Sequence, residues 1–290
     1  DESSKTIWKK NYYIKTEKKL NPILFFSKSK SSLIIVDNIA KYYAVDLDTG
    51  ELLWAKRNSA PFNSQVKLYK DKFFVIDFQN ILRCFSVNDG KELWNVKTDD
   101  TFIKSQKKLS LAISNKTIFF NNSVGDISAV DIESERLIWQ TPTQSSSIYE
   151  NAFLLETSDL VIENDSIYFS NNRNEFYSLD SKTGGINWVQ KINSNVRPTV
   201  IDNFVFTVTI EGFLVIIEKN SGNIIRITDI FEKIKNKKRE SVNPVGFVVG
   251  LNNIYLTTNN GLFIVVDIFS GKTSSITKIG NKKILRPFVV

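Results

Sequence analysis

Short apolar runs recur along the chain and indicate β-strands rather than helices. They are five or six residues long, rich in β-branched and aromatic side chains, and too short for helices. Examples are FFVID at 73–77, TIFFNN at 117–122, SIYFS at 166–170, FVFTVT at 204–209 and LFIVVD at 262–267. Because these runs are nearly continuous instead of alternating with polar residues, we expect strands that are buried on both faces.

A nine-residue pattern occurs six times between these runs, at spacings of 38 to 49 residues. The copies begin at Asp46, Ser86, Asp131, Asp180, Glu218 and Asp267. The fifth position, where a tight turn needs a left-handed backbone, is glycine in every copy except the third, which has Glu135. The ninth position is tryptophan in the first four copies, whereas the last two copies have Arg226 and Ser275.

A second turn is expected six residues before each copy. Asparagine or glycine stands there in five copies, as Asn80, Gly125, Asn174, Gly212 and Gly261, and Ala40 is the exception. Two turns and four strands in each unit predict a four-stranded antiparallel sheet, which is one blade of a β-propeller. A tryptophan at the end of each pattern would lie on the outer strand and cover the next blade.

The repeat predicts an all-β propeller of six complete blades within one domain that covers residues 1–290. Segment 1–14 contains IWKKN, which resembles LWAKRN at 53–58, and we expect it to be the outer strand of a closing blade. Segment 284–290 contains LRPFVV, which resembles VRPTVI at 196–201, and we expect it to be the inner strand of that partial blade. We also expect the natural chain to continue past Val290 and to have seven or eight blades.

The amino-acid composition argues against several classes of enzyme as the function of this chain. The 290 residues include no histidine, which excludes catalytic triads and zinc sites that depend on histidine. The single cysteine, Cys84, excludes an internal disulfide and is expected to be a buried structural thiol. The chain has no methionine, so we expect a processed or trimmed chain that could have lost a signal peptide or a lipidated cysteine. The net charge of +7 weakly favours acidic partners.

Two groups of charged residues leave alternatives open. Asp77, Asp126, Glu175 and Glu211 lie near the middle turns and could hold a metal or form an acid/base pair. Their offsets from the repeated pattern differ, which favours ordinary turn hydrogen bonds. The basic run KIKNKKRE at 233–240 could contact anionic lipid or an acidic protein, although a solvated insertion is favoured.

The Asp-x-x-Thr-Gly-x-x-x-Trp pattern resembles the pyrroloquinoline-quinone-type (PQQ-type) β-propeller family over essentially the whole chain. Within it, the segment VGDISAVDIESERLIWQ at 124–140 resembles the BamB family of periplasmic lipoproteins, which belong to the machinery that assembles outer-membrane β-barrels. The resemblance implies a scaffold that is not an enzyme, binds no cofactor or nucleic acid, and works as a monomer within a complex. It also implies a periplasmic location at the inner face of the bacterial outer membrane, with attachment only through a removed lipid anchor or a partner.

The resemblance further implies that BamA is the partner and that two neighbouring loops on one rim contact its periplasmic domains. The first family loop, Leu-x-Leu-Arg, falls on residues 101–104, where Ile103 keeps an aliphatic side chain and Lys104 keeps a cation. The second falls near Leu154 and Glu156, with one acid where the family has two. The expected partner-binding residues are therefore Phe102, Ile103, Lys104, Leu154 and Glu156.

Two other functions remain open at this stage. One is a PQQ- or metal-dependent propeller enzyme, although the quinoprotein dehydrogenases carry a vicinal disulfide that Cys84 alone cannot form. The other is the ligand-sensing propeller domain of a larger protein.

Overall fold

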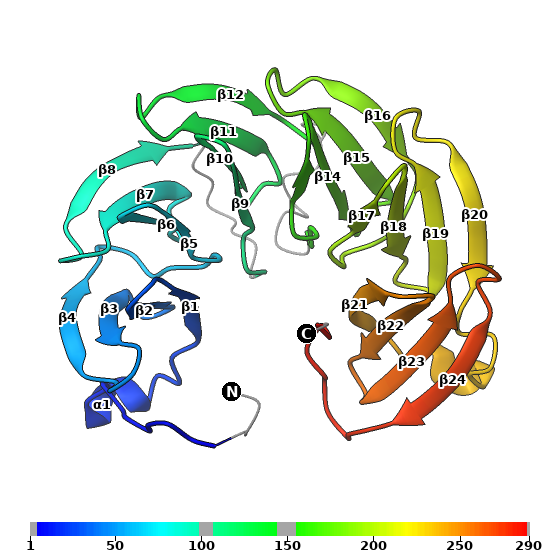
Figure 1. The fold of residues 1–290 in the computed structure, drawn as a ribbon, viewed down its shortest axis with the longest axis horizontal. Helices are drawn as coiled ribbons and strands as arrows, with labels where there is room; N and C mark the ends of the chain where they lie inside the picture. Colours follow the sequence, from blue (N-terminus) through cyan, green and yellow to red (C-terminus); the bar gives the residue numbers. More distant parts are fainter. Residues whose placement is uncertain (1–4, 99–106, 144–154, 289–290) are drawn as a thin grey trace. The chain divides into compact units, whose positions relative to one another are not determined.

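Regular structure in the chain is almost entirely β. The computed structural model describes residues 5–98, 107–143 and 155–288. Two compact units, Asp1–Leu154 and Leu155–Val290, each contain three sheets of four strands. Within every sheet the four strands pair in chain order, each antiparallel to the next (Figure 1). This arrangement is the blade that the repeat predicts.

The strands of the first unit form three sheets. They are β1 (Leu24–Lys28), β2 (Ser32–Asp37), β3 (Lys41–Asp46) and β4 (Leu52–Arg57); β5 (Lys67–Tyr69), β6 (Lys72–Ile76), β7 (Ile81–Ser86) and β8 (Glu92–Lys97); and β9 (Leu111–Ser114), β10 (Thr117–Asn121), β11 (Ile127–Asp131) and β12 (Leu137–Thr141). A single helical turn, α1 (Lys15–Lys18), precedes them.

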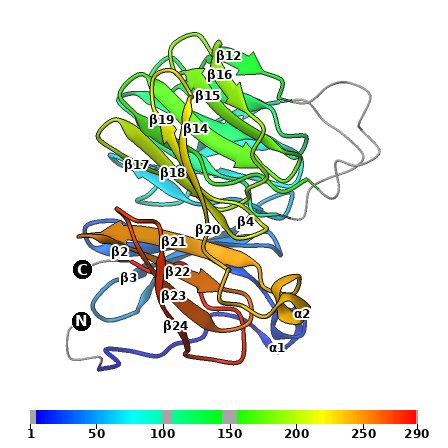
Figure 2. The same ribbon diagram turned by 90° about the vertical axis from the view of Figure 1, so that its right-hand side faces the viewer.

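The second unit repeats this organisation. Its strands are β13 (Val161–Glu163), β14 (Ser166–Asn171), β15 (Glu175–Asp180) and β16 (Ile186–Gln190); β17 (Thr199–Ile201), β18 (Phe204–Val208), β19 (Phe213–Glu218) and β20 (Ile224–Asp229); and β21 (Pro244–Gly250), β22 (Asn253–Thr258), β23 (Leu262–Asp267) and β24 (Thr273–Lys278). The short helix α2 (Asn236–Arg239) lies in the connection between β20 and β21 (Figure 2). In the described part of the chain, neither helix is long and apolar enough to cross a membrane.

The repeated pattern forms the same turn in all six copies. In each, the fifth residue donates its backbone N–H to the carbonyl oxygen of the first residue, at 2.8–2.9 Å. Glu135 has a φ of 64° and Ala40 a φ of 69°, so the two exceptions in the sequence have the left-handed backbone of the other copies. The fold therefore imposes the turn even where the local residue does not favour it.

Tryptophans connect successive sheets, as the sequence predicts. Trp8, Trp54 and Trp188 each donate Nε1–H to the carbonyl oxygen of the second residue in the next copy of the pattern, at 2.9–3.0 Å. The ring of Trp54 also lies against Gly90, where an added Cβ would come within 2.5 Å of it. A glycine at this position thus leaves room for the indole of the preceding copy.

The cores lie between consecutive sheets within each unit. In the first unit, Phe74 and Cys84 of one sheet pack with Ile118 and Val130 of the next. In the second unit, Phe206 packs in the same way with Leu256 of the next sheet. Both faces of the middle strands are covered, which explains why their sequences are apolar without alternation.

The two end segments have no strand among their described residues, 5–14 and 284–288. Trp8 nevertheless makes the contact expected of an outer-strand tryptophan, since it packs over Gly50 and donates to the carbonyl of Leu47. The pairing of the two segments in one closing blade, and with it the single-domain organisation, stays a prediction.

Candidate functional site

One of the five predicted partner-binding residues, Glu156, lies in the part of the chain that the structure describes. Phe102, Ile103, Lys104 and Leu154 lie outside the described residues. The geometry of the candidate site is therefore that of Glu156 and the residues that hold it.

Glu156 enters the second unit as an extension of the sheet that begins with β13. Its backbone N–H donates to Oδ1 of Asn172 at 3.0 Å, and its carbonyl accepts from the N–H of Asn172 at 2.9 Å. The neighbouring Thr157 forms an isolated antiparallel bridge with Asn171, and Leu155 is buried. The backbone of Glu156 is thus fixed on the turn that follows β14.

The side chain of Glu156 is held as well. Its Oε2 accepts a hydrogen bond from Nδ2 of Asn195, on the connection between β16 and β17, while the residue remains exposed. An exposed carboxylate that an amide donor already orients loses little side-chain freedom on binding. Such a group can accept a charge-assisted hydrogen bond from a lysine or arginine of a partner.

The four other carboxylates considered for chemistry lie in separate hydrogen-bond networks. Asp126 accepts from Gln140, Glu175 from Asn171, and Glu211 from Asn193. No group of three or more potential metal ligands occurs among residues 5–98, 107–143 and 155–288. These networks support the interpretation that the carboxylates stabilise turns.

Asp77 is the most buried of these carboxylates, with no exposed surface. It accepts from the backbone N–H groups of Gln79 and Ile81, at 2.9 and 3.2 Å, and forms an ion pair with Nε of Arg83 at 2.6 Å. Arg83 in turn contacts Glu92 at 3.0 Å. A buried charge with this set of partners closes a turn and fixes its sheet.

Cys84 lies in the middle of β7, directly opposite Trp94, and is fully buried. Burial raises the pKa of the Cys84 thiol to about 12. A raised pKa keeps the thiol protonated, and the thiolate is the reactive form. Cys84 is therefore a structural residue, as predicted.

The basic run at 233–240 contains α2. Arg239 joins this helix to β20 through two hydrogen bonds to the carboxylate of Asp229, at 2.7 and 2.8 Å. The side chains of Lys237 and Lys238 are exposed. Lys233 of the same run donates to the carbonyl oxygen of Thr273. The run is thus an insertion anchored by Lys233 and Arg239, with Lys237 and Lys238 in solvent.

Sequence reasoning predicted Glu156 as a partner-binding residue, a role that stays a prediction, and missed Asn172 and Asn195, which position it. They lie 16 and 39 residues away along the chain, and no local pattern connects them to Glu156. The only available signal for Asn172 was its place in the predicted turn after SIYFS.

Comparisons with known proteins agree on one family. The family model "Outer membrane protein assembly factor BamB" matches residues 1–228. BamB of Legionella pneumophila is 22% identical over 245 residues, covering 81% of this chain and 50% of its own length. BamB of Shewanella oneidensis is 19% identical over 232 residues, covering 71% of this chain and 56% of its own length. The chain thus spans about half the length of these curated relatives.

A solved structure confirms the fold. The crystal structure of BamB from Moraxella catarrhalis superimposes with a TM-score of 0.75 at 16% identity, covering 92% of this chain and 79% of that one. The match assigns the six sheets to the β-propeller class that the repeat predicts. Together with the family model, which matches well over half of the residues, it leads to the identification: the chain belongs to the BamB family of outer-membrane protein assembly factors.

Proposed function

We propose that this chain is a non-enzymatic scaffold that binds the periplasmic domains of BamA during the assembly of outer-membrane β-barrel proteins. The observation that carries the proposal is the family match over residues 1–228, which includes both predicted docking loops. The protein would act in the periplasm at the inner face of the outer membrane, held there by a lipid anchor or by its partner.

The proposed BamA-binding residues are Phe102, Ile103, Lys104, Leu154 and Glu156. Ile103 and Leu154 would supply aliphatic contacts, Phe102 would add apolar area, and Lys104 and Glu156 would form charged hydrogen bonds of opposite sign. The fixed backbone and side chain of Glu156 support this role, because a preoriented charge favours binding. As charged groups, Lys104 and Glu156 would influence the association rate as well as affinity.

The experiment is a titration of this chain with purified periplasmic domains of BamA from the same organism, at several salt concentrations. We expect saturable binding that an Ile103→Ala/Lys104→Glu double variant abolishes. Glu156→Gln should weaken it about 5- to 50-fold, the effect of losing one charged contact.

Glu211→Gln is the matched control, because Glu211 is also an exposed glutamate whose carboxylate accepts from an asparagine, Asn193 at 2.7 Å. It should bind like the unmodified chain. If the double variant binds as well as the unmodified chain, the assignment of these binding residues is wrong. If the folded protein does not bind BamA at all, the scaffold role is wrong.

A further inference from the structure

One row of cross-strand neighbours is shared by four sheets. In three of them an aromatic residue, a small residue and a tryptophan stand side by side, as Phe74–Cys84–Trp94, Phe119–Ala129–Trp139 and Tyr168–Ser178–Trp188. The aromatic ring and the indole have centroids 5.6, 6.0 and 6.0 Å apart. In the sheet β17–β20, the corresponding row is Phe206–Ile216–Arg226. This sheet therefore keeps the aromatic residue and lacks the indole.

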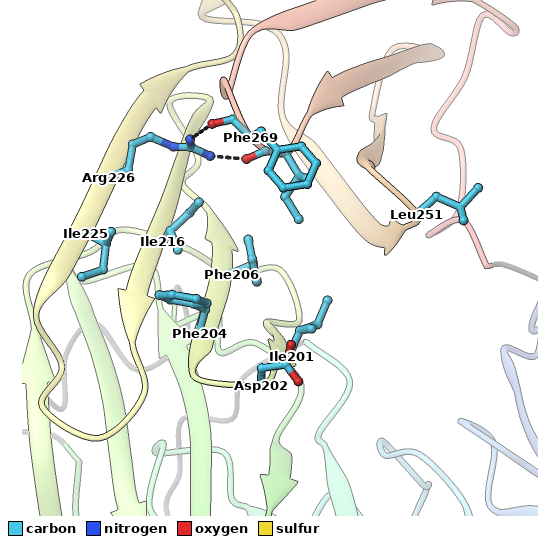
Figure 3. Close-up of a pocket in the computed structure, with 10 residues that line it drawn as sticks. Ile201, Asp202, Phe204, Phe206, Ile216, Ile225, Arg226, Leu251 and Phe269 are labelled. Atoms are coloured by element: carbon cyan, nitrogen blue, oxygen red, sulfur yellow. Dashed lines mark hydrogen bonds between the residues drawn. The ribbon is translucent and has the colours of Figure 1, made fainter.

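Arg226 takes over the hydrogen bond that the tryptophans make. Trp54 and Trp188 donate to the second residue of the next pattern, and in the last copy this residue is Ile268. The guanidinium of Arg226 donates to the carbonyl oxygens of Ile268 and Phe269 (Figure 3). The polar contact is thus kept, but the large apolar surface of the indole is not replaced.

A cavity of about 500 Å³ lies at this position. Its walls include Phe204, Phe206, Ile216, Arg226, Ile268 and Phe269 (Figure 3). In the sheet β5–β8 and its successor, the corresponding Phe74, Cys84, Trp94 and Ile132 belong to one closed core. The cavity is therefore the indole site of the repeat without its indole, and its volume lies in the range of ligand sites, roughly 300–1,000 Å³.

The mouth of the cavity is open and apolar. Ile225, Leu251 and Phe269 are 56%, 96% and 74% exposed. Inside, Phe206 is only 5% exposed, and Nε of Arg226 is buried without a hydrogen bond among the described residues. A bound ring would contact apolar walls, and residues that flank the ring in a polypeptide would cover the apolar rim.

We propose that this cavity binds an aromatic side chain, tryptophan in the first place, from a second polypeptide. The chain itself fills the equivalent space with an indole in three other sheets, with Trp54, Trp94 and Trp188, so the site is already shaped for that ring. Aromatic rings bury large areas and pack favourably against other rings, and the guanidinium of Arg226 lies beside the ring position, where a cation–π contact is available. The exposed rim favours a polypeptide over a small isolated molecule.

The test is a titration of the ¹⁵N-labelled chain with short synthetic peptides, followed by NMR. One peptide has a single central tryptophan flanked by valines, and matched peptides have leucine or alanine in its place. We expect saturable shifts at Phe206, Arg226 and Phe269 with the tryptophan peptide, and a dissociation constant on the order of 0.1–1 mM. The leucine peptide should bind at least fivefold more weakly, and the alanine peptide should cause no saturable shift.

Two variants locate the site. Ile216→Ala/Arg226→Trp restores the small residue and the tryptophan of the other rows, so it should fill the cavity, keep the fold and weaken peptide binding at least tenfold. Phe269→Ala removes an exposed wall without affecting the core and should weaken binding several-fold. Phe288→Ala, at a phenylalanine that is 82% exposed and outside the cavity, is the matched control and should have no effect.

Three results would overturn the proposal. The first is the absence of saturable binding by the tryptophan peptide. The second is binding of the leucine peptide with equal affinity, which would indicate a general apolar surface. The third is unchanged binding by both cavity variants, which would place the contact elsewhere.

Discussion

At the residue scale, indole and glycine depend on each other across consecutive sheets. Gly222 has a φ of 75°, and a Cβ added there would lie 2.6 Å from the ring of Trp188. Glycine at this position therefore has two effects: it adopts the left-handed backbone of its own turn without strain, and it leaves room for the indole of the preceding sheet.

We expect Gly222→Ala to lower the free energy of unfolding by about 2–4 kcal/mol, because left-handed strain adds to overpacking against Trp188. Urea denaturation followed by circular dichroism measures this change. Gly280→Ala is the control, since an added Cβ there meets nothing within 4 Å, and it should change stability by less than about 0.5 kcal/mol. Equal effects of the two substitutions would contradict the role of the indole contact.

The third copy shows what happens when glycine is replaced. Glu135 has the required backbone conformation, but it carries a Cβ where an added Cβ would meet an indole at Gly50, Gly90 and Gly222. Trp94, which precedes this turn, is buried with its Nε1 lacking a hydrogen bond among the described residues. Trp54 and Trp188 thus make their Nε1 hydrogen bond where the next turn has a glycine. Trp94 is followed by Glu135 and stays buried without that bond.

At the element scale, an acidic side chain closes the turn before most outer strands. Oδ1 of Asp180 accepts from the backbone N–H groups of Thr183 and Lys182, at 2.8 and 3.0 Å, and from the hydroxyl of Thr183 at 2.9 Å. The hydrogen bond from the Thr183 backbone is the main reason that the pKa of Asp180 is lowered. The pKa values of Asp46 and Asp131 are lowered in the same way, each by the backbone N–H at the corresponding position.

These turns predict a loss of stability in acid. A carboxyl with a lowered pKa in the folded state stabilises the fold fully above its ordinary pKa, roughly 4, and this contribution disappears as pH falls through the folded value. We expect the urea midpoint to decrease steadily below about pH 4. An Asp180→Asn variant, which keeps an acceptor but cannot titrate, should lose less stability than the unmodified chain over this range.

Asp48→Asn is the control for this series, because it removes the same charge at an exposed position of the first turn. Asp180→Asn should change the pH profile more than Asp48→Asn does. If the two substitutions change it equally, the hydrogen bonds of the turn do not contribute to the acid sensitivity.

At the scale of the whole molecule, burial differs between corresponding strands of the sheets. The four central residues of β19 are all buried, whereas only two residues of β23 are. In each sheet the fourth strand is more exposed than the third, as β20 is compared with β19. Protection of the backbone is therefore uneven, although every sheet has the same pairing order.

Hydrogen exchange followed by mass spectrometry should reveal this gradient. We expect peptides from β19 to exchange more slowly than peptides from β23, and those from β20 to exchange faster than β19, because opening exposes less buried surface in the faster strands. Equal protection of β19 and β23 would show that the second unit opens only as a whole.

The sequence predicted the sheets and turns because their signals are local and repeated. Apolar runs such as the one at 166–170 lie within the observed strands, and glycine or asparagine marks most of the left-handed positions. Ala40 and Glu135 could not be recognised by residue type, since packing and pairing impose their conformation.

The candidate site was less accessible to sequence reasoning. Glu156 was found through family resemblance, but its supporting Asn195 comes from a distant connection that only the fold brings close. Arg226 was visible as a loss of the repeated tryptophan, yet the sequence could not show that a cavity results. That conclusion needs the register that places Phe206 and Ile216 in the same row.

The contact of Trp8, Trp54 and Trp188 with the glycine of the following turn limits where a unit of this protein can be cut when the protein is redesigned. Trp54 belongs to one sheet and Gly90 to the next, so neither sheet carries both halves of the contact. A designer who copies, deletes or exchanges a unit at the boundaries of a sheet separates these partners at both junctions. A segment that keeps both partners runs from one tryptophan to the following glycine turn, as from Trp54 to Gly90. A gene duplication whose ends lie inside the sheets would keep this contact intact.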